Sequence, residues 1–353
     1  MLKQADIIKK HAVDGYLYGR VGEDHFVVIA DEATFNEEHL YECRETLQNV
    51  LSDSVYNVRV CFGIYRTDNM NESLSFMCDK ASFAVASIKD DTHSFIAYYD
   101  DTMLEAAIKY KTIVDEFDDA IKAGEFKMYL QPQISAKTRR LTGAEALVRR
   151  IKPDGTIISP IDFIPVYEKS GLISRLDRYI WEQAAAKLGE WKKAGINMSI
   201  SVNISPKDFY YIDIFNTFAG LIKKYDIEPS NLKIEITETT IMSDVPNLMG
   251  ELEELRKAGF TLEMDDFGSG YSSLNTLKDI NVDVLKVDMG FIKETKNVKK
   301  SRIILASVIK MAKELNLLII TEGVETEEQV DNLTKLGCDV FQGYYFSKAI
   351  DVN

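Results

Sequence analysis

The stretch EMDDFGSGYSSL, from Glu263 to Leu274, decides how the rest of the chain is interpreted. It follows an apolar, β-branched run and carries two adjacent carboxylates, Asp265 and Asp266, directly before Gly268 and Gly270. Neighbouring side chains of a strand point to opposite faces, so two adjacent aspartates share one target only where the strand ends and turns. Such a pair suits a hard divalent cation, although a solvated acidic turn is the alternative for this stretch taken alone.

The composition of the 353-residue chain limits the classes of protein to consider. The length suggests two domains, or one barrel with an appendage. The net charge of −14 argues against non-specific binding to DNA, to RNA or to an anionic membrane. Because the four cysteines lack CxxC spacing, and no membrane-spanning run or signal peptide is found, we expect a cytoplasmic protein with reduced thiols.

Histidine is confined to the first hundred residues, at His11, His25, His39 and His93. Any chemistry from Ser94 onward therefore proceeds without imidazole. A metal site in that part of the chain would be rich in oxygen ligands, which favours Mg²⁺ or Mn²⁺ over zinc.

The spacing of apolar residues divides the chain into three parts. Residues 1–100 predict a small α/β unit with a hairpin around Gly22, and residues 101–112 predict a helical connector. From residue 113 to residue 353, strands and helices are predicted to alternate regularly, which is the pattern of a (β/α)₈ TIM-like barrel. The eight predicted strands are Phe126–Ile134, Leu141–Ile151, Ser199–Ile204, Leu232–Thr237, Phe260–Asp265, Val284–Val287, Leu317–Thr321 and Val340–Tyr344.

Polar residues recur toward the C-terminal ends of seven of these strands. They are Glu145, Asn203, Glu235, Asp265 with Asp266, Lys286, Glu322 and Gln342. Catalytic residues of such barrels lie at the C-terminal face, and a charge inside an apolar strand is costly unless it is paired or coordinated. The pattern therefore predicts one polar active site at that face.

Seven motifs in this order resemble the EAL domain, the cyclic di-GMP phosphodiesterase family, over about Ile113 to Val352. They are Glu145–Arg149 (EALVR), Val202–Ser205 (VNIS), Glu235–Glu238 (EITE), Asp265–Leu274, Leu285–Asp288 (LKVD), Glu322–Glu325 (EGVE) and Gln342–Phe346 (QGYYF). The resemblance implies metal-dependent hydrolysis of cyclic di-GMP to linear pGpG in bacterial signalling, and a homodimer formed through the EAL domain. A catalytically weak cyclic di-GMP receptor or scaffold is the alternative, but no family ligand is missing here.

The resemblance also implies two Mg²⁺ or Mn²⁺ ions, because two such ions can activate a water and stabilise an in-line displacement. The residues that resemble ligands of the first ion are Glu145, Asn203, Glu235 and Asp265. The residues that resemble ligands of the second are Asp265, Asp266 and Glu322, with Asp265 bridging the two ions.

Further roles follow from the same resemblance. Lys286 is similar to the family lysine that contacts the attacking water, and Gln342 to a residue beside the metal site. Arg149 and Gln131 resemble substrate contacts. The departures from the family pattern are Arg150 in place of Trp, Ser269 in place of Thr and Ala349 in place of Pro, and none of them is a metal ligand.

Glu238 resembles a family glutamate that clamps the loop 265–274. Hydroxyl groups of Ser269, Ser272 or Ser273 are candidate partners for its carboxylate. The alternative is a solvated acid at the end of the strand.

The first hundred residues resemble the C-terminal two-thirds of a degenerate GGDEF (diguanylate cyclase) domain, with the signature turn at Gly22–Phe26 (GEDHF). Glu23 replaces a glycine of the family turn and His25 replaces a metal-binding acid. Val13 and Tyr16 replace the Arg and Asp of the inhibitory site, and the opening strand of the family lies before Met1. These changes predict no cyclase activity. The unit is expected to serve packing or dimerisation, or to keep a regulatory nucleotide site.

Overall fold

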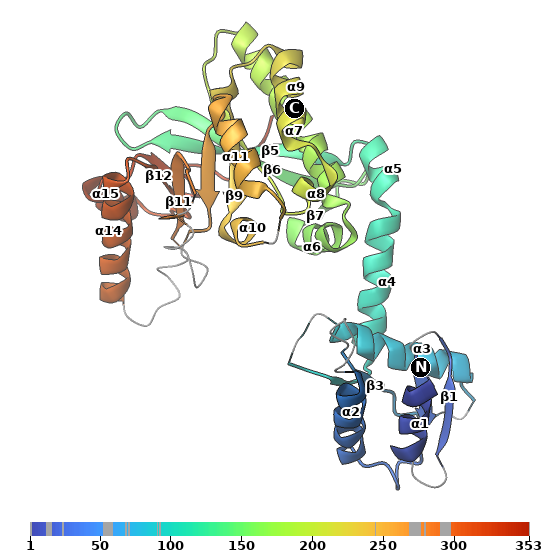
Figure 1. Cartoon of the computed structure of the whole chain (residues 1–353). Coiled ribbons are helices and arrows are strands. Elements are labelled where there is room, and N and C mark those ends of the chain that lie inside the picture. Colours follow the sequence, from blue (N-terminus) through green and yellow to red (C-terminus); the bar gives the residue numbers. More distant parts are fainter. Residues whose placement is uncertain are drawn as a thin grey trace. The chain divides into compact units, whose positions relative to one another are not determined.

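The computed structural model describes residues 2–11, 16–22, 25–51, 59–67, 69, 71–89, 91, 93–243, 245–267, 277–278, 280–289 and 298–352 (Figure 1). The chain forms two compact units, Met1–Thr112 and Ile113–Asn353. Within the described ranges, no helix is both long and apolar enough to cross a membrane.

The described residues of the first unit form short strands and three helices. They are α1 (Leu2–His11), β1 (Leu17–Arg20), β2 (Phe26–Ile29), α2 (Glu38–Leu51), β3 (Phe62–Ile64), α3 (Leu74–Ser87) and β4 (Ile96–Tyr98), followed by α4 (Asp101–Asp115). Strands β1 and β2 form an antiparallel hairpin, and β3 pairs with β4 in parallel. Ser73 begins α3 by accepting a hydrogen bond from the Phe76 N–H at 3.3 Å, as an N-cap serine does.

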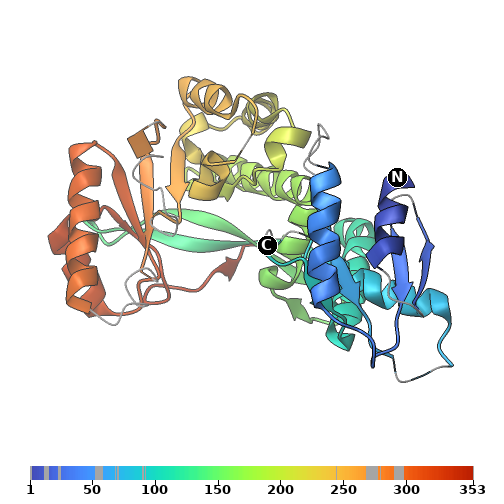
Figure 2. The same ribbon diagram turned by 60° about the horizontal axis from the view of Figure 1, so that its bottom comes forward.

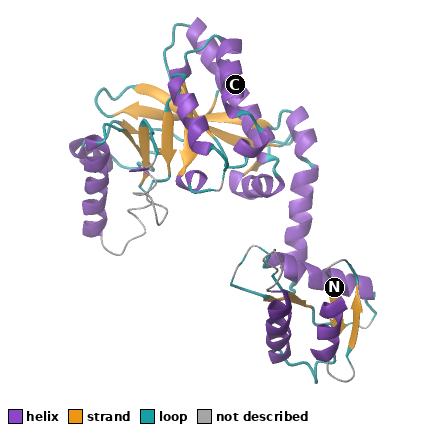
Figure 3. Cartoon of the chain, in the orientation of Figure 1, coloured by secondary structure: helices purple, strands orange, loops and turns teal. Residues whose placement is uncertain are grey.

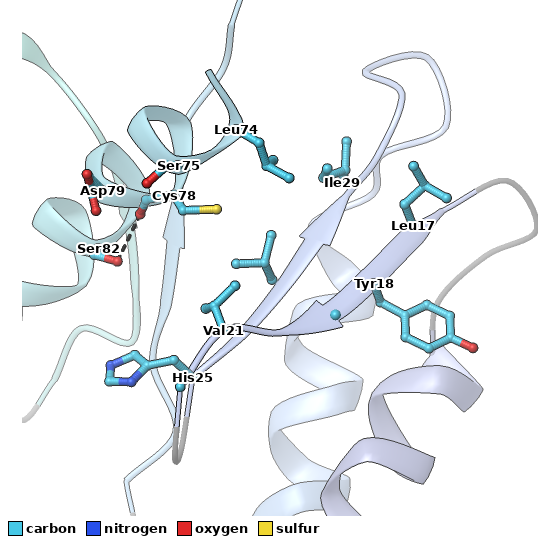
Figure 4. Close-up of a pocket in the computed structure, with 13 residues that line it drawn as sticks. Leu17, Tyr18, Val21, His25, Ile29, Leu74, Ser75, Cys78, Asp79 and Ser82 are labelled. Carbon is cyan, nitrogen blue, oxygen red and sulfur yellow. Dashed lines mark hydrogen bonds between the residues drawn. The ribbon is translucent and has the colours of Figure 1, made fainter. Parts of the chain in front are cut away.

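A cavity of about 730 Å³ lies in this unit between the hairpin and α3 (Figure 4). Apolar side chains of the hairpin, among them Leu17, Val21 and Ile29, line one side, and Cys78 and Ser82 of α3 line the other. Gly22 and His25 of the altered signature turn also line the cavity. Glu23 and Val13 lie outside the described residues, so the expectations placed on them stay predictions.

The second unit is a closed barrel of eight strands with helices on its outside (Figure 3). The barrel strands are β5 (Phe126–Ser135), β6 (Leu141–Ile151), β8 (Ser199–Asn203), β9 (Leu232–Thr237), β10 (Leu262–Asp265), β11 (Val284–Asp288), β12 (Leu318–Glu322) and β13 (Val340–Phe341). The short strands β7 (Ile157–Ile158) and β14 (Ile350–Asp351) extend the sheet beside β6 and β5.

The predicted regular alternation of strand and helix is wrong at the first strand. β5 runs antiparallel to both of its neighbours, β6 and β13, and a hairpin rather than a helix joins β5 to β6. Arg139 lies in this turn with a positive φ of 56°. Five residues separate the two strands, whereas a parallel crossover needs a dozen or more, so the connection can only be a hairpin. The other seven barrel strands are parallel, as predicted.

Helices cover the outside of the parallel strands. They are α5 (Phe117–Lys122), α6 (Pro160–Ser170), α7 (Ile173–Lys193), α8 (Asp208–Tyr211), α9 (Ile214–Tyr225), α10 (Glu238–Ile241), α11 (Leu248–Lys257), α14 (Val298–Glu314) and α15 (Glu327–Leu336), with a 3₁₀ turn at Pro229–Asn231. Helices α14 and α15 lie outside β11 and β12 in both views (Figures 1 and 2). A capping box of Thr326 and Gln329 begins α15, and Gly337 ends it with a φ of 97°.

Two strands are shorter than predicted by two residues or more, for local reasons. The Phe260 N–H bonds to the Leu255 carbonyl and so closes α11 instead of starting β10. β13 ends at Phe341 because the chain packs closely against Val324 at Gly343. A Cβ at Gly343 would come within 2.2 Å of the Val324 carbonyl oxygen, so only glycine fits there.

Candidate active site

The ammonium group of Lys286 lies at the centre of the barrel and is fully buried. Four carboxylates surround its Nζ within 4 Å. They are Glu322 at 2.6 Å, Glu235 at 2.7 Å, Asp265 at 3.2 Å and Glu145 at 3.5 Å. These residues were predicted from the sequence to share one face, and the structure brings them to one point.

Parallel strands place these side chains. Lys286 comes from β11, Glu235 from β9 and Glu145 from β6, while Asp265 and Glu322 are the last residues of β10 and β12. The apolar residues that alternate with them, such as Ile234 and Ile236 beside Glu235, pack fully buried in the core. Because the carboxyl ends of parallel strands meet at one face, acids from distant parts of the chain converge there.

Two amide side chains donate hydrogen bonds to the Glu145 carboxylate. The Asn203 Nδ2 donates to Glu145 Oε1 at 3.4 Å, and the Gln342 Nε2 donates to Glu145 Oε2. The Trp181 Nε1 donates to the Asn203 carbonyl at 3.0 Å, which ties the end of β8 to α7. Asn203 and Gln342 thus lie where the sequence placed them.

Asp266 turns the chain at the end of β10. Its φ is +56°, a left-handed conformation that aspartate tolerates better than most residues, and its N–H donates to Asp265 Oδ1 at 2.9 Å. The two aspartates therefore sit together at the strand end. From Gly268 onward, the predicted turn lies outside the described residues.

Burial and mutual repulsion dominate the electrostatics of this cluster. Desolvation, with repulsion from Glu145 and Asp265, raises the pKa of Glu235 well above its ordinary value and that of Glu322 to about 8, although Lys286 opposes both shifts. Burial by itself lowers the pKa of Lys286, but the surrounding carboxylates outweigh it and hold that pKa well above its usual range. The lysine therefore remains an ammonium.

The donor set fits hard divalent cations. The carboxylates of Glu145, Glu235, Asp265 and Glu322 surround the Lys286 ammonium, and Asp266 adds a fifth carboxylate at the end of β10, which gives a formal charge of −4 when all five are ionised. Within the described ranges no three His, Cys, Asp or Glu side chains already surround a common metal position, since the carboxylates converge on the ammonium instead. The buried Glu235 Oε1 has no hydrogen-bond partner among the described groups, which leaves a lone pair for a cation.

Comparison with known proteins assigns the fold to a family. The sequence profile of the EAL domain matches residues 114–349. This chain belongs to the EAL domain family. The match covers the whole barrel and every residue of the cluster, and it does not cover the first unit, so the likeness to a GGDEF domain stays a prediction.

Two relatives and one solved structure show how similar this chain is to individual proteins. The signaling protein YkoW of Bacillus subtilis is 31% identical over 343 residues, 96% of this chain and 43% of YkoW. The probable cyclic di-GMP phosphodiesterase PdeG of Escherichia coli is 37% identical over 238 residues, 65% of this chain and 46% of PdeG. The chain thus spans less than half the length of either protein. The solved structure of the PaMucR phosphodiesterase in complex with c-di-GMP is 32% identical, with a TM-score of 0.64, and the match covers 68% of this chain and 98% of the solved chain.

The two predicted substrate contacts of the EAL domain line one cavity of about 170 Å³ beside the cluster. Gln131 of β5 lies opposite Glu145 in the strand register, and Arg149 lies on β6 opposite Lys127. The remaining lining residues are Tyr129, Ile157, Tyr344, Lys348 and Ala349. The Lys348 Nζ stands 5.5 Å from the centre of the Tyr344 ring, so the cavity offers aromatic faces together with positive charge.

The sequence did not indicate a second buried ion pair in the EAL barrel. The Lys233 Nζ lies 2.8 Å from Glu263 Oε1, and Glu263 is fully buried. Repulsion from Glu263 contributes to the raised pKa of Glu235. The sequence does not show whether a lysine and an acid on neighbouring strands form a buried or an exposed ion pair. The alternation of side chains along a strand shows which face each residue lies on, but not how deeply that face is buried.

Glu238 of the EAL domain is buried, with 1% of its surface exposed. It is the first residue of α10, directly after the N-cap Thr237. The alternative of a solvated strand-end acid is therefore wrong. The serine hydroxyls that were expected to face Glu238 lie outside the described residues, so its role as a loop clamp remains a prediction.

Glu238→Gln should lower kcat by about 10-fold with a smaller change in KM, because a neutral amide removes the negative charge of this buried carboxylate while keeping its shape. Steady-state kinetics with cyclic di-GMP at several Mn²⁺ concentrations measure this. Glu190→Gln, an exposed glutamate on α7, is the matched control. Equal kinetics for Glu238→Gln and wild type would show that Glu238 has no functional role.

Proposed function

We propose that this EAL domain hydrolyses one phosphodiester bond of cyclic di-GMP and releases linear pGpG, with Mg²⁺ or Mn²⁺ as cofactor. The observation that carries the proposal is the convergence of acidic and amide oxygen donors on one buried point of the barrel. The likeness to PdeG and to the cyclic di-GMP complex of PaMucR supports the choice of substrate.

We infer that the acids of the cluster hold two cations. Glu145, Asn203, Glu235 and Asp265 would hold the first, and Asp265, Asp266 and Glu322 the second. The formal charge of −4 on the cluster matches the charge of two divalent ions. When bound, such cations polarise the phosphodiester and lower the pKa of water, which is why the site needs no histidine.

The other residues of the site act on the substrate and on the water. Lys286 keeps its proton at Nζ, so it can donate a hydrogen bond that turns a lone pair of the water toward phosphorus. Arg149 offers a planar guanidinium, which suits two oxygens of one phosphate, and its Nη1 already donates to the Val148 carbonyl at 2.8 Å. Gln131 provides an amide at the same cavity.

We also propose that residues 1–100 are a degenerate GGDEF unit without cyclase activity. The hairpin β1–β2 flanks the altered turn, and His25 stands where an acid is needed for a metal. No observation favours the receptor alternative over the enzyme, since all the acids and amides of the site are present.

Incubation of the purified chain with cyclic di-GMP and Mn²⁺ or Mg²⁺ should yield pGpG, identified by chromatography and mass spectrometry. EDTA should stop the reaction, and added Mn²⁺ should restore it. GTP in the same buffer should yield no cyclic di-GMP. Undiminished hydrolysis by the metal-stripped protein would contradict the two-cation proposal. Tight cyclic di-GMP binding without any product would favour the receptor instead.

A further inference from the structure

Gln133 of β5 is buried beside the cluster, with 1% of its surface exposed, although nothing in the sequence marked it as a site residue. Its Nε2 donates to Gln342 Oε1 at 3.2 Å and lies 3.4 Å from the Ser201 Oγ. The antiparallel register of β5 pairs Gln133 with Gly143 near the start of β6 and the next residue, Ile134, with Phe341 of β13.

The hydrogen bond to Gln342 decides which way that amide faces. A glutamine amide has one acceptor end and one donor end, and they are interchangeable in shape. With Gln133 donating to the Oε1 of Gln342, the Nε2 of Gln342 faces the Glu145 carboxylate and donates to Oε2. The reverse orientation would place a carbonyl oxygen against a carboxylate oxygen, which is repulsive.

The neighbouring strand leaves room for the Gln133 side chain. Gly143 of β6 is the register partner of Gln133. A Cβ at Gly143 would stand 2.5 Å from the Ser199 Oγ and 3.3 Å from the Gln133 Oε1. Glycine at this position therefore keeps the space in which the carboxamide of Gln133 lies.

We propose that Gln133 is a positioning residue for the metal site: it fixes the amide of Gln342, which in turn holds the Glu145 carboxylate in place. This inference rests on the proposed function for its kinetic consequences but not for its effect on metal binding. A ligand that its neighbours hold in one rotamer binds a cation with less ordering cost. Loss of such a supporting group typically lowers metal affinity or activity by about 10- to 100-fold.

Two substitutions separate the hydrogen bond from the shape of the side chain. Gln133→Met keeps the length but cannot donate, so the Gln342 amide loses its fixed orientation. Gln133→Glu, when ionised, can only accept, so it draws the Gln342 Nε2 away from Glu145. We expect Mn²⁺ affinity, measured by titration calorimetry, to fall about 10-fold in the first variant and further in the second. Gln183→Met on α7 is the matched control and should leave Mn²⁺ affinity unchanged.

A double-mutant cycle distinguishes positioning from a merely structural role. In a Gln342→Met background, Gln133→Met should change Mn²⁺ affinity less than about 2-fold, because the group through which Gln133 acts is gone. Equal losses in both backgrounds, or unchanged Mn²⁺ affinity in Gln133→Met, would overturn the inference. If the wild type binds Mn²⁺ but does not hydrolyse cyclic di-GMP, the proposed function fails while this cycle still tests Gln133.

Discussion

Lys286→Met should abolish most of the turnover and, in the absence of metal, should also weaken the fold. The methionine keeps the length of the lysine but removes the ammonium that faces Glu145, Glu235, Asp265 and Glu322. Removing one partner of a buried ion pair costs about 3–5 kcal/mol, because the charges left behind have no compensation. Loss of a positioned proton donor lowers kcat by about 10²- to 10⁴-fold.

The two effects of Lys286→Met can be measured separately. Both tryptophans of the chain, Trp181 and Trp191, lie in α7, so their fluorescence reports unfolding of the barrel alone. Urea unfolding in EDTA should show the loss of stability, and saturating Mn²⁺ should restore part of it, because the cations replace the missing positive charge. Turnover should stay low under both conditions.

Lys224→Met is the matched control for that experiment. Lys224 pairs with Glu182 at the surface, and its side chain is 61% exposed. An exposed ion pair contributes at most about 1 kcal/mol. A Lys286→Met barrel as stable as wild type in EDTA, or one that retains normal turnover, would show that the ammonium does not hold the cluster together.

Glu145→Gln should have the opposite effect on the metal-free fold and the same effect on activity. The substitution removes one of the carboxylates whose repulsion raises the pKa of Glu235 and Glu322, so the barrel in EDTA should be as stable as wild type or more stable. A neutral amide is a poorer ligand for a hard cation, so Mn²⁺ affinity and kcat/KM should each fall at least about 100-fold.

Calorimetric titration with Mn²⁺ and urea unfolding in EDTA test Glu145→Gln together. Glu190→Gln on α7, whose side chain is 65% exposed, is the control and should change neither quantity. Wild-type turnover in Glu145→Gln would remove Glu145 from the metal site. A large loss of metal-free stability would mean that its carboxylate supports the barrel and does not strain it.

Much of this architecture was predictable from local patterns. The amphipathic helix α7, the capping box of α15 and the apolar strands each follow from residue spacing, because burial of one face requires apolar residues at fixed intervals. The polar residues at the strand ends could be found in the same way. Lys286, Glu235 and Glu322 interrupt apolar runs, and such interruptions are costly unless the charges meet.

The sequence by itself determined the eight strands and the acids at their ends, and tertiary structure decided what those acids meet. The alternation of side chains along a strand shows the face on which each residue lies, but not the direction of the strand. The antiparallel direction of β5 was therefore not predicted, even though its five-residue connection to β6 was too short for a parallel crossover. The antiparallel direction of β5 also places Gln133 within hydrogen-bond distance of Gln342, which lies 209 residues away in the sequence. Closure of the barrel likewise decides the surroundings of the Lys233–Glu263 pair and of the Lys286 ammonium. Only the closed barrel excludes water from these charges, which would stay solvated on separate strands.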